Sequence, residues 1–179
     1  MFSDNTLTPK EAIRLCALGT LALEPVRYAA LAGAIRHFVS RLIGPSLDVM
    51  GSSVEMLKYE GLVEAVDGAG MEDDATFAIT AEGREELRNL LTARIRTGAT
   101  ELNKLVFALK FRFLHLLEAD DQRLQADLLI EVCDSELARL DDLRQNHAGG
   151  AGYLTDWLDH DIGQLEGRLS WLKDFRARL

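Results

Sequence analysis

The chain has 179 residues, a formal net charge of −9, two cysteines and a hydrophobic content of 47%. This length suits one or two small domains that need each other, or a second copy of the chain, to bury enough apolar surface. No apolar run approaches the roughly 18 residues that cross a membrane, and no basic and apolar leader opens the sequence. These features predict a cytoplasmic protein without a membrane partner.

Two helices are expected near the start of the chain. Thr8 suits the N-cap of the first helix, Pro9 suits its first position, and Glu11 completes a capping box. This helix is expected to run to about Leu23, because the Glu-Pro pair that follows disfavours helical backbone. A second helix is predicted over about residues 28–42, before a Gly-Pro pair.

A third helix, two strands and a fourth helix are predicted next. The third helix spans about residues 47–59 and ends before Gly61, a residue that tolerates positive φ. Short strands at 62–66 and 76–79 flank a glycine-rich reversal, and Thr80 can cap the helix that follows. This order predicts a mostly α (α+β) fold: a winged helix-turn-helix domain with a two-stranded wing, whose third helix usually enters the DNA major groove.

The second half of the chain differs from the first in its predicted secondary structure, which is entirely helical. A break of small residues near 97–100 indicates a boundary between a winged helix-turn-helix domain over residues 1–97 and a C-terminal helical dimerisation domain over residues 98–179. Three helices are expected in the second domain, over about residues 101–117, 122–146 and 154–177.

The last helix carries apolar residues at alternating steps of four and three, which is typical of a helix that lies along another helix. Too few helices accompany it to cover this seam well within one chain, so the pattern predicts a homodimer. The alternative is packing of the seam inside one chain. The predicted dimer interface consists of the seam and the aromatic residues near it: Leu158, Ile162, Leu165, Leu169, Trp171, Leu172 and Phe175.

Several motifs together point to one family. Ser46 opens the third helix, residues 57–63 read LKYEGLV, and residues 77–87 read FAITAEGREEL. The apolar helix at 105–117 and the LSWL segment at 169–172 extend the similarity to nearly the whole chain. On these residues the chain resembles the PadR-like family of bacterial winged-helix transcriptional regulators.

The resemblance implies a homodimeric, sequence-specific DNA-binding regulator, usually a repressor, on a palindromic operator of double-stranded DNA. It also implies release by a small apolar or aromatic effector held between the winged helix and the C-terminal helices. The aromatic side chains expected there can equally be ordinary core residues. The candidate effector residues are Phe107, Phe111, Phe113 and Trp157.

Charge argues against simple phosphate binding. Residues 1–90 hold eight Lys or Arg against fourteen Asp or Glu, whereas DNA-binding domains usually show a basic patch. The third helix also departs from the family pattern, because Glu55 and Met56 stand where relatives usually have basic residues. What remains is a local cluster of cations and hydroxyls, each of which is otherwise a solvated surface residue. The candidate DNA contacts are Lys10, Arg14, Arg27, Arg36, His37, Arg41, Ser46, Ser52, Ser53 and Lys58.

Catalytic and metal-binding patterns are missing from the sequence. The four histidines lack ligand partners at a recognised spacing, and no nucleophile motif is present, so we expect neither an enzyme nor a cofactor. Asp156 and His160 could hold a metal ion weakly, although a surface ion pair explains their spacing equally well. Cys16 and Cys133 are predicted to be buried free thiols, with a redox-sensing thiol as the alternative.

Two functions therefore stay open. The first is the dimeric repressor described above. The second is a winged-helix protein-interaction module that has lost DNA binding and docks a basic partner through its acidic wing. The acidic residues of the wing are Asp67, Glu72, Asp73 and Asp74.

Overall fold

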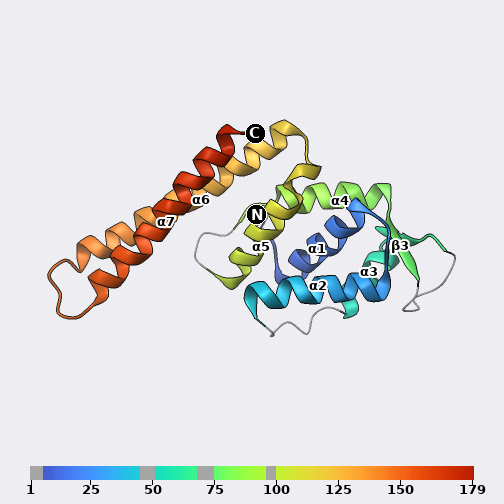
Figure 1. Ribbon diagram of the computed structural model, residues 1–179, viewed down its shortest axis with the longest axis horizontal. Coiled ribbons are helices and arrows are strands. Elements are labelled where there is room, and N and C mark those ends of the chain that lie inside the picture. The colour runs from blue at the N-terminus through green and yellow to red at the C-terminus, as the bar shows by residue number, and fades with distance from the viewer. Residues whose placement is uncertain (1–5, 45–50, 68–74, 96–99) are drawn as a thin grey trace, which may run out of the picture. The chain divides into compact units, whose positions relative to one another are not determined.

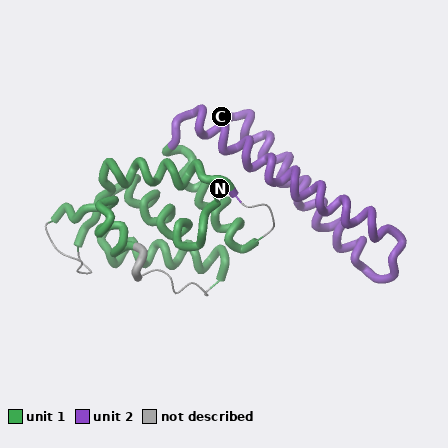
Figure 2. The backbone as a smooth tube through the Cα atoms, turned by 180° about the vertical axis from the view of Figure 1, so that it is seen from behind, with its two compact units in different colours: residues 1–94, 100–116 green, residues 95–99, 117–179 purple. Residues whose placement is uncertain are grey.

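The computed structural model describes residues 6–44, 51–67, 75–95 and 100–179, without the side chains of residues 51–53 (Figure 1). Ser46 and the wing acids Glu72, Asp73 and Asp74 therefore lie outside the described residues. The chain forms two compact units (Figure 2). Unit 1 consists of residues 1–94 and 100–116, and unit 2 consists of residues 95–99 and 117–179.

The fold is mostly helical with one small antiparallel sheet, which confirms the predicted winged helix-turn-helix followed by C-terminal helices. Unit 2 is built from α6 (Ala119–Asn146) and α7 (Leu154–Ala177). The elements of unit 1 are α1 (Pro9–Leu23), β1 (Val26–Arg27), α2 (Tyr28–Ile43), α3 (Gly51–Tyr59), β2 (Val63–Ala65), β3 (Thr76–Ile79), α4 (Ala81–Thr92), α5 (Glu101–Phe113) and the short 3-10 helix η1 (Leu114–Leu116).

Helix α1 begins as predicted and forms the centre of unit 1. The Thr8 hydroxyl accepts a hydrogen bond from the Glu11 backbone N–H, and the Glu11 carboxylate accepts one from the Thr8 N–H at 2.7 Å. The helix contacts α2, α3, α4, α5 and β3, so Ile13, Leu15 and Leu18 are all completely buried. Burial on nearly all sides explains why α1 lacks a polar face.

The sheet has three strands in the order β1-β3-β2, one more than the sequence indicated. The two predicted wing strands are present, and β1 adds to the far side of β3, with Val26 opposite Phe77 and Arg27 opposite Thr76. The Tyr28 N–H continues this pairing by donating to the Ala75 carbonyl at 2.9 Å. A two-residue strand carries no hydrophobic alternation, so only its backbone pairing reveals it.

Close packing at Gly83 fixes the first turn of α4 against the end of α3. Thr80 caps α4 by accepting from the Gly83 N–H at 3.0 Å, and its hydroxyl donates to the Gly61 carbonyl at 2.8 Å. A Cβ added at Gly83 would lie 2.1 Å from the Leu62 carbonyl oxygen. Backbone cannot move aside as a flexible side chain can, so only glycine fits here.

We expect Gly83→Ala to lower the free energy of unfolding by about 2 kcal/mol, because the added methyl group forces α4 away from the Leu62 carbonyl. Gly33→Ala on α2 is the matched control, since a Cβ there meets nothing within 4 Å. That control should raise stability by up to about 1 kcal/mol through helix propensity. Urea denaturation measures both, and equal midpoints for the two variants would contradict the packing argument.

A buried lysine connects α5 to the end of α4. Lys110 is 1% exposed, and its ammonium group donates to the carbonyls of Leu91 and Ala93, the latter at 2.8 Å. Leu91 lies in the last turn of α4 and Ala93 directly follows the helix, where the helix itself supplies no donors. Burial lowers the pKa of Lys110 from 10.5 to about 7. Lys110 therefore caps α4 from a neighbouring helix.

The depressed pKa of Lys110 makes stability depend on pH. Between about pH 7 and 10.5 the unfolded chain binds a proton that the folded chain lacks, so stability should rise with pH in that window, on the order of 1 kcal/mol per pH unit. Below the folded pKa both states are protonated and the slope disappears. Thermal unfolding at about pH 7, 8 and 9 tests this against Lys110→Met, which lacks the titrating amine. Parallel pH profiles for the two proteins would refute it.

Helix α5 packs on α1 and α2 within unit 1. The small residues before this helix predict that it belongs to the C-terminal domain. The boundary itself, at residue 97, lies outside the described residues and stays a prediction. The helix ends at Phe113 and passes into η1, where a single helix to Leu117 was expected.

Unit 2 is a two-helix hairpin whose seam is closed within one chain. Helices α6 and α7 pack along each other, and α7 has the bounds that its pattern predicted. The intrachain alternative thus accounts for the seam, and the homodimer stays a prediction. All five seam residues are buried: Leu158, Ile162, Leu165, Leu169 and Leu172.

Part of the apolar surface of α6 is exposed. Ala126, Leu129 and Cys133 are buried, whereas Leu124 and Leu143 are exposed. The helix carries more than one apolar stripe, and the position of α7 decides which stripe is covered. The exposed leucines leave the hairpin with apolar surface that its own helices do not cover.

Candidate nucleic-acid interface

The cations of α2 lie on its solvent side. Leu31, Ile35 and Val39 are buried, and the 3.6-residue period places Arg36, His37 and Arg41 on the opposite side, where all three are exposed. Within the described ranges, neither arginine forms an ion pair. These guanidinium groups are available to phosphate.

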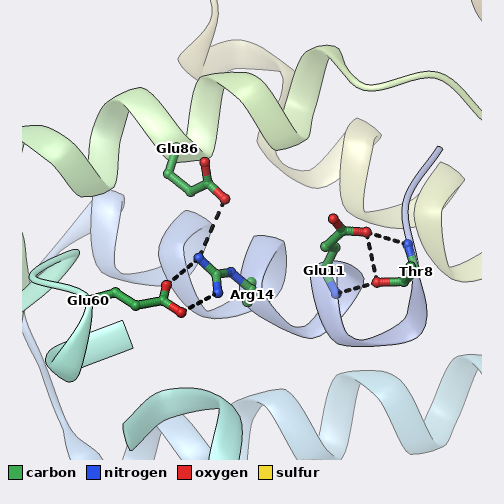
Figure 3. Close-up of polar contacts among 5 residues, drawn as sticks. All are labelled: Thr8, Glu11, Arg14, Glu60 and Glu86. Carbon is green, nitrogen blue, oxygen red and sulfur yellow. Dashed lines mark hydrogen bonds and ion pairs between the residues drawn. The ribbon is translucent and has the colours of Figure 1, made fainter. Parts of the chain in front are cut away.

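Arg14 has a different role, inside the fold. From α1 its guanidinium binds both carboxylate oxygens of Glu60, at 3.1 and 2.6 Å, and also contacts Glu86 on α4 at 3.5 Å (Figure 3). The hydrogen bond to Glu60 raises the pKa of Arg14. Bidentate pairing of this kind fixes geometry as well as charge. Arg14 thus connects α1 to the chain just after α3 and to α4.

The remaining predicted contacts are dispersed. Lys10 is exposed in the first turn of α1, and Arg27 is exposed on the edge strand β1. Lys58 is half-buried, with its ammonium nitrogen 5.6 Å from the centre of the Phe77 ring. Ser52 and Ser53 lie in α3, where their side chains are not described. The structure therefore brings Arg36, His37 and Arg41 together on one helix, while Arg14 and Lys58 serve internal contacts.

The aromatic residues that were candidates for binding an effector lie in different environments. Phe113 is fully buried, and a Cβ added at Gly19 would lie 2.6 Å from its ring. Phe107 and Phe111 are half-buried on α5, and Trp157 belongs to unit 2, where 57% of it is exposed. Phe113 is thus a core residue, as the alternative interpretation of these aromatic residues held.

Arg112 forms cation-π contacts that the sequence does not predict. The Arg112 guanidinium lies 4.7 Å from the ring centre of Phe38 and 4.9 Å from that of Phe113. One of its nitrogens is 4.0 Å from the Cys16 sulfur. Because Phe38 and Cys16 are distant from Arg112 in sequence, no local pattern signals these two contacts. The contact with Phe38 adds an attractive interaction between α5 and α2.

The thiols and histidines show no reactive arrangement among the described residues. Cys16 and Cys133 are buried free thiols, as predicted, and burial raises the pKa of Cys16 to about 11 and that of Cys133 above its usual value. A thiol with a raised pKa is a poor nucleophile near neutral pH. Gln164 donates to a ring nitrogen of His160, and no group of three metal-ligating residues occurs in the described part of the chain.

A family model identifies the chain. The model described as "Putative AphA-like transcriptional regulator" matches residues 2–176. The chain belongs to this family. Membership confirms the PadR-like resemblance and the prediction of a winged-helix transcriptional regulator that binds DNA, not an enzyme. No curated protein matches the sequence.

Several solved structures are similar along their whole length. The structure of smu.1604c from Streptococcus mutans UA159 is 19% identical, covers 96% of this chain and 99% of that chain, and has a TM-score of 0.39. Bacillus subtilis PadR in complex with operator DNA is 15% identical, with coverages of 96% and 100% and a TM-score of 0.40. The same PadR in complex with p-coumaric acid is 14% identical, with coverages of 97% and 98% and a TM-score of 0.41.

None of the helices in the described ranges is both long enough and apolar enough to cross a membrane. This agrees with the absence of a long apolar run in the sequence.

We expect Arg14 to stabilise unit 1, and its partner Glu60 to share the effect. Arg14→Gln and Glu60→Gln should each lower the free energy of unfolding by about 1 kcal/mol, since the pair is only partly screened from solvent. The double variant should lose little more than either single variant, because both remove the same interaction. A chemical-denaturation double-mutant cycle measures this coupling; strictly additive losses would show that the pair contributes nothing.

Proposed function

We propose that this regulator is a homodimeric repressor that binds a palindromic operator through α3 and the cations of α2. The observation that carries the proposal is the exposed group of Arg36, His37 and Arg41 on the first helix of the helix-turn-helix pair. In this motif the first helix crosses the phosphate backbone while the second enters the major groove. Phosphate contacts from α2 would hold α3 in register against the bases.

Exposed apolar surface on unit 2 supports the homodimer. Trp157 and Trp171 are 57% and 48% exposed, and Tyr153, Leu154 and Leu124 are also exposed. Trp171 stacks on Phe175 with ring centres 5.5 Å apart, which gives it a defined orientation. Exposed apolar side chains of this size are typical of an interaction surface, and a two-fold dimer would match a palindromic operator.

We further propose that a small apolar or aromatic effector releases the protein from its operator. Phe107 and Phe111 are half-buried on α5, so their rings can meet a small apolar or aromatic molecule without unfolding the core. Phenolic acids, including p-coumaric acid, are suitable first probes. Release of operator DNA on their addition would support an effector-controlled repressor.

The competing function is a protein-interaction module that docks a basic partner through its acidic wing. The acidic charge balance of residues 1–90 favours it. Retention of random genomic fragments at about 50 and 200 mM salt separates the two functions, since phosphate contacts weaken steeply over this range. Enrichment of one palindromic sequence supports the repressor; no enrichment at either salt supports the interaction module.

We expect Arg36→Glu with Arg41→Glu to abolish operator retention while leaving the fold intact, because both side chains are exposed. The slope of log affinity against log salt should fall by about one for each phosphate contact removed. Arg84→Glu with Arg139→Glu makes the same charge change on exposed residues of α4 and α6 and should retain the operator. Unchanged retention by the α2 variant would mean that another surface meets the phosphates.

We expect Trp157→Glu with Trp171→Glu to convert the dimer into a monomer, since charged side chains would replace the exposed aromatic surface. Light scattering measures the mass. Circular dichroism should show unchanged helix content, because both tryptophans lie outside the buried seam of the hairpin. A dimeric mass for this variant would place the interface elsewhere.

A further inference from the structure

The outward face of α3 has an unusual composition for a helix that enters DNA. Val54 and Leu57 are buried, so the helical period turns Glu55, Met56 and Tyr59 toward solvent. Met56 is 47% exposed and Tyr59 is 87% exposed. In its described part, this face offers a carboxylate, a thioether and a phenol, and no cation.

No contact within the fold explains the presence of a glutamate at position 55. Among the described residues it forms neither a hydrogen bond nor an ion pair. The nearby cation on the same helix, Lys58, is directed to the Phe77 ring at 5.6 Å. The neighbouring acid Glu60, by contrast, is held by Arg14. The Glu55 carboxylate is therefore exposed and uncompensated on the face where base contacts are made.

Base edges in the major groove discriminate strongly against a carboxylate. Guanine presents two acceptors there and thymine presents a carbonyl oxygen, and all three repel a carboxylate. Adenine presents its N6 amino group beside the N7 acceptor, whereas cytosine presents only its N4 amino group, which donates to Asp or Glu side chains without an acceptor on the same base. An apolar side chain such as Met56 complements the methyl group of thymine. The carboxylate of Glu55 and the side chain of Met56 are thus suited to contact a cytosine and a neighbouring thymine.

We propose, on the basis of the DNA-binding function proposed above, that Glu55 is a specificity-determining residue that accepts a hydrogen bond from the N4 amino group of a cytosine in each half-site. Met56 contacts the methyl group of a neighbouring thymine. Affinity comes from phosphate contacts by the exposed cations of α2, and Glu55 chooses among the sequences that those contacts hold.

The sign of the charge decides how Glu55 acts. A carboxylate close to the phosphate backbone repels every duplex, so it lowers non-specific affinity. A hydrogen bond to cytosine offsets this repulsion at the correct site only. Specificity then comes mainly from weakened binding to wrong sequences. Removal of the charge should therefore strengthen non-specific binding while the preference for cytosine is lost.

The test is selection of binding sites from a random duplex library by the full-length wild type, Glu55→Gln and Glu55→Ala. The wild type should enrich a palindrome with cytosine at one position of each half-site. In both variants discrimination at that position should fall roughly 5- to 150-fold, the range for a base contact. Glu85→Gln, an exposed acid on α4, is the matched control and should keep the wild-type preference.

A second arm changes the DNA. Replacing the selected C·G pair by T·A should weaken wild-type binding and leave Glu55→Ala binding nearly unchanged, which shows that residue and base act together. If the variants keep the wild-type preference at every position, the role of Glu55 is refuted while operator binding stands. If the wild type itself enriches no sequence, the proposed function fails too, and the outward face of α3 is left for a protein partner.

Discussion

The architecture of unit 1 depends on the complete burial of α1. Leu15, Cys16 and Leu18 are inaccessible to solvent, and α2, α3, α4 and α5 all contact α1. At Gly19 the missing side chain lets the Phe113 ring of α5 lie directly against the helix. Because α2 and α3 are both positioned against this central element, the geometry of the helix-turn-helix pair follows from core packing. Surface residues can therefore vary widely without loss of the fold.

That freedom explains how an acidic domain can serve a regulator. Total charge governs long-range attraction to DNA, whereas the placement of a few groups governs the final complex. Arg14 is paired with Glu60 within the fold, while Arg36 and Arg41 remain exposed on α2. We expect such a protein to bind bulk DNA weakly and to depend on a small number of well-placed contacts. Weak bulk binding is useful to a regulator that must find few sites among many.

Features fixed by neighbouring residues could be predicted from the sequence. The capping box at Thr8, the cap at Thr80 and the bounds of α7 follow from local chemistry, and the exposure of Arg36 and Arg41 follows from helical period. Features fixed by distant partners could not. Strand β1 exists because β3 pairs with it, and Glu60, the partner of Arg14, is 46 residues away. The covered stripe of α6 likewise depends on α7.

Strand β1 has a mechanical consequence for the helix-turn-helix and the wing. It leads directly into α2, and it is hydrogen-bonded along β3, whose other side carries β2. The Tyr28 N–H at the start of α2 extends this ladder to Ala75. Helix α2 and the strands β1, β3 and β2 are thus joined by one continuous series of backbone hydrogen bonds. In the proposed complex, this pairing sets the separation of α2 and the wing before DNA arrives, so an operator would have to match that span or bend to meet it.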